Sequence, residues 1–183
     1  MKKIITIPNK TLREKAKEVL EVDKKLKNFI SEFEETLDKK RNPRGIGLAA
    51  PQVDKLLRIF SINLDGIETY INPKIIKTSK KVIFGPNSED PILEACLSIP
   101  NLYGPVPRFS WIEVEFQIIE NDKLINRKAK LEAFKARVFQ HEFDHLNGIL
   151  FTDYSLKYNL PVYKGSSRGD ELQEVDPALL ELY

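Results

Sequence analysis

The 183-residue sequence predicts an α+β fold in which antiparallel β-sheets surround one central helix. Three observations predict it. Apolar residues recur with helical spacing over residues 23–39 and again over 131–147, and they alternate with polar residues over 111–119. The apolar share of 42% and the charged share of 31% are typical of a soluble globular chain. Since no linker or internal repeat interrupts the sequence, we expect one domain over residues 1–183.

The helices are placed by their capping signals and by their periodicity. Thr11 is suited to cap a short N-terminal helix, and Gly148 is suited to end the helix over 131–147. The helix over 23–39 is followed by the break Asn42-Pro43-Arg44-Gly45. Its apolar face consists of Leu26, Phe29, Ile30, Phe33 and Leu37.

The middle of the chain is rich in β-branched and aromatic residues between turn signals. We expect strands over residues 57–62, 70–71, 74–84, 111–119 and 124–130, with residues 120–123 forming the turn between the last two. Residues 154–169 contain Pro161 and four other turn formers, Gly165, Ser166, Ser167 and Gly169, which favours an irregular loop. The acidic end, residues 170–183, is expected to be partly helical.

The charge balance and the short N-terminal apolar run argue against nucleic-acid binding and against membrane insertion, respectively. Lys and Arg total 29 against 27 Asp and Glu, so the chain has no basic surface of the kind that binds nucleic acid. The apolar residues 4–7 end at Pro8, which is too short for a signal peptide or a membrane span. We therefore expect a cytoplasmic protein.

The rarest residues are the most informative about chemistry. The chain has one cysteine, Cys96, and two histidines, His141 and His145. A single cysteine cannot form an internal disulfide, so it packs, binds a metal or acts as a nucleophile. If the protein binds a metal through sulfur and imidazole, these three residues are the only donors available.

The two histidines lie in His141-Glu142-Phe143-Asp144-His145, at a spacing that places both on one helix face. There they can chelate one metal ion, and Glu142 can take a proton from a water molecule beside it. The same pattern also arises in helices that bind no metal, where the histidines are hydrogen-bonded core residues. Because they are the only histidines of the chain, we favour a metal site.

A catalytic metal usually has three protein ligands and one open position. Cys96 is the natural third ligand, but a free cysteine is also a common buried apolar residue. Spacing along the chain leaves both interpretations open.

Three segments together resemble the signature of the peptide deformylase family. They are Gly45-Ile46-Gly47-Leu48-Ala49-Ala50-Pro51-Gln52, Glu94-Ala95-Cys96-Leu97-Ser98 and Gln140-His141-Glu142-Phe143-Asp144-His145-Leu146-Asn147-Gly148. Arg108 and residues 131–132 and 150–153 also fit, so the resemblance covers about residues 12–153 of a single catalytic domain.

The resemblance implies a metal-dependent hydrolase that removes the formyl group from the formylmethionine of newly made peptides and releases formate. It implies one divalent ion, Fe²⁺, on Cys96, His141 and His145, although the donors also suit Zn²⁺, Ni²⁺ or Co²⁺. Activated water would attack the formyl carbon, and Glu142 would pass the proton of the water to the leaving amine. The Gln52 side chain and the Leu97 N–H would stabilise the oxyanion.

Further residues are expected to bind the peptide. The resemblance places Ile46 and Gly47 beside the substrate backbone, and it implies that Glu94 and Ala95 also bind the substrate. Phe134 and Val138, on the helix face of His141, are candidates for the methionine pocket. Glu94 could accept a hydrogen bond from Gln52, and Asp144 could anchor the helix or orient a ligand. A solvated position or a structural salt bridge is an equally good interpretation for Glu94, Asp144 and Arg108.

The chain departs from the family pattern at two places. Ala95 stands where the family commonly has glycine, and its methyl group would narrow the cleft. The family also implies transient ribosome contact, but the tail after Asp153 lacks the basic helix that some relatives use for it.

Two other classes of function are consistent with parts of the sequence. A zinc peptidase would use Glu171 or Glu174 as its third ligand, which leaves Cys96 and Gln52 without a role. A metal-binding or ribosome-associated module without activity would not need Glu142 as a base. Both fit the sequence less well than a deformylase.

Overall fold

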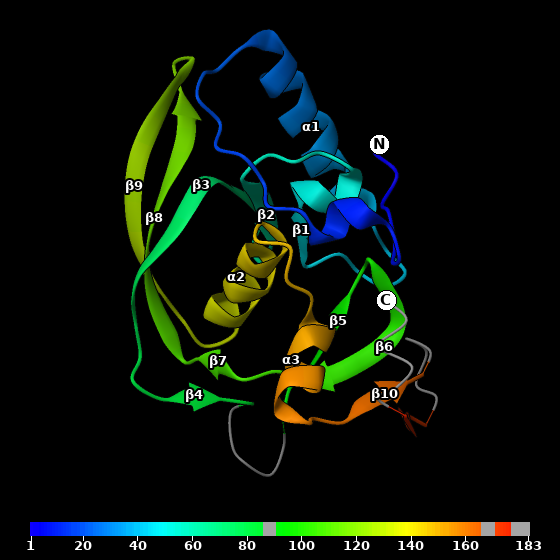
Figure 1. Ribbon diagram of the computed structural model, residues 1–183. Helices are drawn as coiled ribbons and strands as arrows, with labels where there is room; N and C mark the ends of the chain where they lie inside the picture. The colour runs from blue at the N-terminus through cyan, green and yellow to red at the C-terminus, as the bar shows by residue number, and fades with distance from the viewer. Residues whose placement is uncertain (86–90, 166–170, 177–183) are drawn as a thin grey trace.

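The computed structural model describes residues 1–85, 91–165 and 171–176. It confirms the predicted α+β class, with antiparallel sheets arranged around the central helix α2 (Figure 1). The helices are the 3-10 helices Lys10–Arg13 and Ala50–Val53, α1 (Lys24–Lys39), α2 (Ala133–His145) and α3 (Phe151–Tyr158). The strands are β1 (Gly47–Ala49), β2 (Ile59–Asn63), β3 (Ile67–Thr78), β4 (Val82–Ile83), β5 (Leu93–Cys96), β6 (Ile99–Pro105), β7 (Arg108–Phe109), β8 (Trp111–Glu120), β9 (Lys123–Glu132), β10 (Val162–Lys164) and β11 (Gln173–Val175).

The larger sheet has the strand order β1-β2-β3-β8-β9. Its longest hairpin, β8–β9, turns at Asn121 and Asp122, which both have positive φ as a tight two-residue turn requires. This is the turn that the sequence predicts. β9 runs on to Glu132, however, so the expected helix start at residue 131 is wrong. Leu131 is instead a buried strand residue, and the helix begins at Ala133.

The second sheet has the order β11-β10-β6-β5 and carries the C-terminal part of the chain. The expected loop over 154–169 is wrong, because α3 extends to Tyr158 and β10 follows it. Asp153 begins α3 by accepting a hydrogen bond from the Leu150 N–H at 2.9 Å, and Phe151 packs into the core. The acidic end was expected to be partly helical, but Gln173–Val175 form the strand β11. Residues 166–170 and 177–183, on which parts of the two expectations fall, lie outside the described residues.

Smaller differences concern the first helix and the third strand. The N-terminal helix is a 3-10 turn capped by Asn9, whose side chain accepts from the Thr11 N–H, so Thr11 is not the cap. β3 is continuous where the sequence suggests two strands, and it changes register through bulges between residues 71 and 78. The helix over 23–39 agrees with α1, which begins after Asp23.

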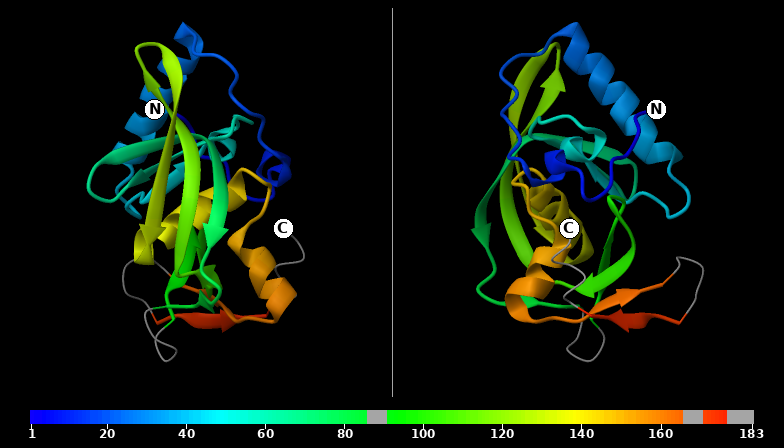
Figure 2. Two further views of the ribbon diagram at one scale, coloured as in Figure 1. Left: turned by 90° about the vertical axis from the view of Figure 1, so that its left-hand side faces the viewer. Right: turned by 45° about the vertical axis from the view of Figure 1, so that its right-hand side comes forward.

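α2 packs against the larger sheet through its apolar face. The Phe139 ring meets Phe60 and Tyr70 edge-on, with centroids 4.8 Å and 5.1 Å away. α1 lies across the other end of this sheet, where Phe33 and Leu37 are fully buried. The views of Figure 2 show α2 between the long β8–β9 hairpin and the smaller sheet. The histidine-bearing face of α2 is therefore turned toward β5.

Among the described residues, no helix has the length and apolar character that crossing a membrane requires.

Candidate metal centre

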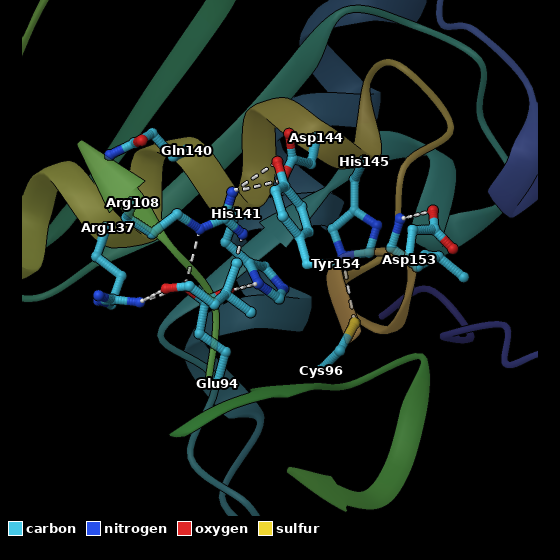
Figure 3. A network of polar contacts seen from close by, with 12 residues as sticks. Glu94, Cys96, Arg108, Arg137, Gln140, His141, Asp144, His145, Asp153 and Tyr154 are labelled. Atoms are coloured by element: carbon cyan, nitrogen blue, oxygen red, sulfur yellow. Dashed lines mark hydrogen bonds and ion pairs between the residues drawn. The ribbon is translucent and has the colours of Figure 1, made fainter. Parts of the chain in front are cut away.

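The structure brings Cys96, His141 and His145 together (Figure 3). Cys96 is the last residue of β5, directly before the tight turn into β6, and both histidines lie on α2. Their candidate ligand atoms all lie within 4.8 Å of one another, and Cys96 Sγ is 3.2 Å from Nε2 of His145. Neighbouring donors of a tetrahedral site lie about 3.3–3.8 Å apart, so the cluster has the size that one ion needs.

Two N–H groups point at the sulfur of Cys96. The Ser98 backbone N–H and Gln52 Nε2 each lie 3.4 Å from Sγ. Gln52 is buried, and its Oε1 accepts a hydrogen bond of 2.8 Å from the Ala49 N–H. These donors fix the position of the sulfur beside the two histidines.

The orientation of His141 is set by Glu94. The Glu94 Oε2 atom lies 2.9 Å from Nδ1 of His141, which places the ring proton on Nδ1 and leaves Nε2 for a ligand bond. The expected hydrogen bond between Glu94 and Gln52 is wrong. Gln52 instead contacts Ser98 and Cys96, and the carboxylate of Glu94 is occupied by other donors.

The other donors to Glu94 are two buried arginines. Arg108 donates to both carboxylate oxygens, through Nε at 2.9 Å and Nη2 at 2.8 Å, and Arg137 donates to Oε1 at 2.9 Å. Burial raises the pKa of the Glu94 carboxyl, but Arg108 outweighs this and holds it well below its usual range. Glu94 is therefore an ionised and fully hydrogen-bonded group.

Asp144 belongs to the same buried network. Its Oδ2 accepts from Arg108 at 2.5 Å and from the Tyr154 hydroxyl at 3.0 Å (Figure 3). The carboxylates of Glu94 and Asp144 are thus matched by the guanidinium groups of Arg108 and Arg137, next to the candidate metal ligands. Asp144 forms a buried ion pair with Arg108, so its effect on His141 passes through Arg108 and Glu94.

Three further residues, Arg137, Tyr154 and Ser98, contact the site but were not predicted to do so. Arg137 lies one helical turn before His141, and this spacing could have identified it. Tyr154 belongs to α3, in the segment that was expected to be a loop, so no signal marked it.

Glu142 lies beside the ligands with an unusual environment. Its side chain is only 4% exposed, burial raises its pKa to about 7, and its Oε2 has no hydrogen-bond partner among the described residues. The backbone of Gly47 passes directly in front of it. A Cβ at position 47 would lie 2.7 Å from Cδ of Glu142 and closer still to Oε1, so any side chain there would displace the Glu142 carboxylate.

A cavity of about 570 Å³ opens in front of this centre. Its walls include every residue that the sequence analysis assigned to the substrate or to the oxyanion: Ile46, Gly47, Gln52, Glu94, Ala95, Leu97, Phe134 and Val138. Cys96, His141 and Glu142 also line it, so a ligand in the cavity would reach the centre.

The residues present fit a metal ion. The donor set is one sulfur and two imidazoles, which together suit a divalent transition-metal ion. Glu171 and Glu174 are not in the cluster that the described residues form. The peptidase alternative, which needs one of them, therefore has no geometric support.

An α+β fold in which a cysteine sulfur, two imidazoles and a buried glutamate meet beside one cavity defines a candidate centre of the metallohydrolase class. The family model for polypeptide deformylase matches residues 1–159, and the chain belongs to the peptide deformylase family. The resemblance found in the sequence is thereby confirmed, and the members of this family are enzymes.

Individual relatives agree with this assignment. The chain is 36% identical to a peptide deformylase of Helicobacter acinonychis (strain Sheeba), with 94% of this chain and 93% of the relative covered. A crystal structure of the peptide deformylase from Thermotoga maritima is 35% identical, with a TM-score of 0.74 over 84% of this chain and 97% of that chain. The Synechococcus elongatus peptide deformylase in complex with actinonin is 34% identical, with a TM-score of 0.72 over 84% of this chain and 78% of that one.

Proposed function

We propose that this protein removes the formyl group from the N-terminal formylmethionine of newly made peptides and releases formate, with one divalent metal ion on Cys96, His141 and His145. The observation that carries the proposal is the meeting of these three ligands with Glu142 at one cavity. A bound divalent ion would lower the pKa of a water molecule so that hydroxide forms near neutral pH. The family resemblance favours Fe²⁺, although Zn²⁺, Ni²⁺ or Co²⁺ would suit the same donors.

Glu142 is proposed as the general base and acid. Its unpartnered Oε2 is available to accept a proton from the attacking water and to deliver that proton to the departing amine nitrogen. A pKa near the working pH serves both transfers, and burial moves the pKa of Glu142 in that direction.

Gln52 and Leu97 are proposed to stabilise the oxyanion of the tetrahedral intermediate. The Gln52 amide is held in place at its Oε1, with Nε2 directed toward the centre. Leu97 follows the ligand Cys96 on the cavity wall, where its backbone N–H is the second proposed donor. Loss of one such donor typically costs about 3 kcal/mol of transition-state stabilisation.

The peptide is proposed to lie as an added strand between β1 and β5. Each is the edge strand of its own sheet, and the cavity separates them. Ile46 and Gly47 would pair on one side and Glu94 and Ala95 on the other. Since the Glu94 carboxylate is occupied, only its backbone is free to contact the peptide.

The methionine side chain requires an apolar pocket. Phe134 and Val138 line the cavity two turns and one turn before His141, respectively, on the same face of α2, and are proposed as its walls. Both sheets and α2 contribute to this one cavity, so we expect residues 1–183 to act as one catalytic domain. We also expect it to act on nascent chains in the cytoplasm. The described tail forms β10 and β11 and offers no basic helix for ribosome contact.

The proposal is tested by incubating the purified protein with formyl-Met-Ala and with the unformylated Met-Ala-Ala, and measuring formate and new amine. We expect equal amounts of formate and amine from the first peptide and no product from the second. Glu142→Gln serves as the matched control and should lose turnover. Cleavage of the unformylated peptide without formate would overturn the deformylase proposal.

A further inference from the structure

The cavity in front of the metal centre has an inner and an outer end. At the inner end Gly47 lies against Glu142. The residues after Gly47 in β1 are fully buried, whereas those before it continue along the cavity wall. The wall residues of this outer part are Lys40, Asn42, Pro43, Arg44 and Ile46. A peptide that starts at the metal centre must therefore leave along the segment 40–46.

The opposite wall of the outer part carries no charge. It consists of Ala95 in β5 and of Pro100, Asn101 and Tyr103 in β6. A side chain of the departing peptide thus meets uncharged groups on one side and the segment 40–46 on the other.

That segment presents two cations to the cavity. Neither Lys40 nor Arg44 has a carboxylate partner among the described residues. Their neighbours differ, since Lys39 is paired with Glu35 at 2.5 Å and Arg41 donates to the carbonyl oxygen of Asp38.

No acid on the described cavity walls compensates these cations. The carboxylates that line the cavity there are Glu94 and Glu142, both at the inner end. Glu94 is neutralised by Arg108 and Arg137. The described walls of the outer end therefore carry two uncompensated cations that a substrate can complement.

We propose, on the basis of the proposed deformylase function, that Lys40 and Arg44 select formylated peptides with an acidic residue at the third or fourth position. Arg44 lies three residues before Gly47, beside which the formylmethionine is placed. Each residue of an extended peptide advances ~3.3 Å, so its third and fourth residues come beside Arg44. The Gly45 N–H donates to the Lys40 carbonyl oxygen at 3.1 Å, which holds Lys40 next to the same part of the peptide.

The test compares the amides formyl-Met-Ala-Xaa-Ala and formyl-Met-Ala-Ala-Xaa, with Asp, Asn or Lys as Xaa. An amide end removes the terminal carboxylate, which would otherwise compete for the same cations. In at least one series we expect kcat/KM for Asp to exceed that for Asn by about threefold to tenfold, the range that one or two partly exposed ion pairs supply, with Lys lowest. The difference should appear mainly in KM and should shrink as salt is added.

Two variants assign the preference to its residues. Lys40→Gln combined with Arg44→Gln should make the Asp and Asn peptides equal. Arg41→Gln is the matched control, because Arg41 is an exposed arginine of the same segment that does not line the cavity, and it should keep the preference. The wild-type series decides the question even if the double variant does not fold.

Equal kcat/KM values for Asp, Asn and Lys in both series of the wild-type protein would overturn the inference and leave the deformylase function standing. A preference that survives in a folded double variant would overturn it as well. Absence of formate from every peptide would overturn the proposed function and the inference together.

Discussion

Glu94 lies between the candidate metal ligand His141 and two buried arginines. It accepts hydrogen bonds from Arg108 and Arg137 and fixes Nδ1 of His141, although it is only 6% exposed. A buried charge of this kind is tolerable only when its partners are present. The network is thus a requirement for the ligand geometry and for stability at once.

Removal of Arg108 should therefore destabilise the fold. In Arg108→Met the buried carboxylates of Glu94 and Asp144 each lose a partner, and we expect a loss of about 3 kcal/mol in the free energy of unfolding. Denaturant titration measures this loss. Lys128→Met, which breaks the exposed pair with Glu115, is the control and should change the midpoint little. Equal midpoint shifts in the two variants would contradict this view of the network.

Gly47 is the second residue on which the geometry of the candidate site depends, because its missing side chain leaves room for the Glu142 carboxylate. An added methyl group would displace the Glu142 carboxylate, and a displacement of about 1 Å can cost roughly a hundredfold in rate. We expect Gly47→Ala to keep its fold and its metal while kcat falls to that extent. Circular dichroism, metal content and initial rates separate these effects. Full turnover in Gly47→Ala would show that the position of Glu142 is not critical.

At the scale of elements, α1 shows how local sequence sets a boundary. Asp23 accepts a hydrogen bond of 2.6 Å from the Leu26 N–H and so satisfies one of the free donors at the helix start. The helix is then held by Leu26, Phe33 and Leu37 in the core beneath it.

The cap predicts a measurable loss of stability. Asp23→Ala should lower the free energy of unfolding by about 1 kcal/mol, whereas Asp23→Asn, which can accept the same hydrogen bond, should lose little. Thermal or denaturant unfolding of both variants decides this. If Asn costs as much as Ala, the side-chain cap is not the cause.

The elements that the sequence predicted well are long and periodic. α1 and β8 follow from apolar spacing, and the β8–β9 turn follows from the turn-forming residues Asn121 and Asp122, which adopt positive φ in the structure. α3 has only eight residues and is held by packing of Phe151 and by the Asp153 cap, so its periodicity is too short to read. β10 and β11 have three residues each; β10 pairs with β6, which lies far away in the sequence, and β11 pairs only with β10.

At the scale of the whole molecule, the candidate centre joins parts of the chain that are distant in sequence. His141 and His145 are one helical turn apart, so their proximity follows from the sequence alone. Cys96 comes from the smaller sheet and Gln52 from the segment after β1, and only the packing of both sheets around α2 brings them to the histidines. Physical reasoning from the sequence could therefore predict two ligands, while the third depended on family resemblance.

The central claim is that these three residues hold one metal ion. It is tested most directly by the metal content per chain of anaerobically purified wild-type protein, Glu142→Gln and Cys96→Ala. We expect one equivalent, with iron predominant, in the wild-type protein and in Glu142→Gln, because Glu142 is not a ligand. Cys96→Ala should retain far less, since it loses one of three ligands. A folded Cys96→Ala protein that keeps a full equivalent of tightly bound metal would contradict the account.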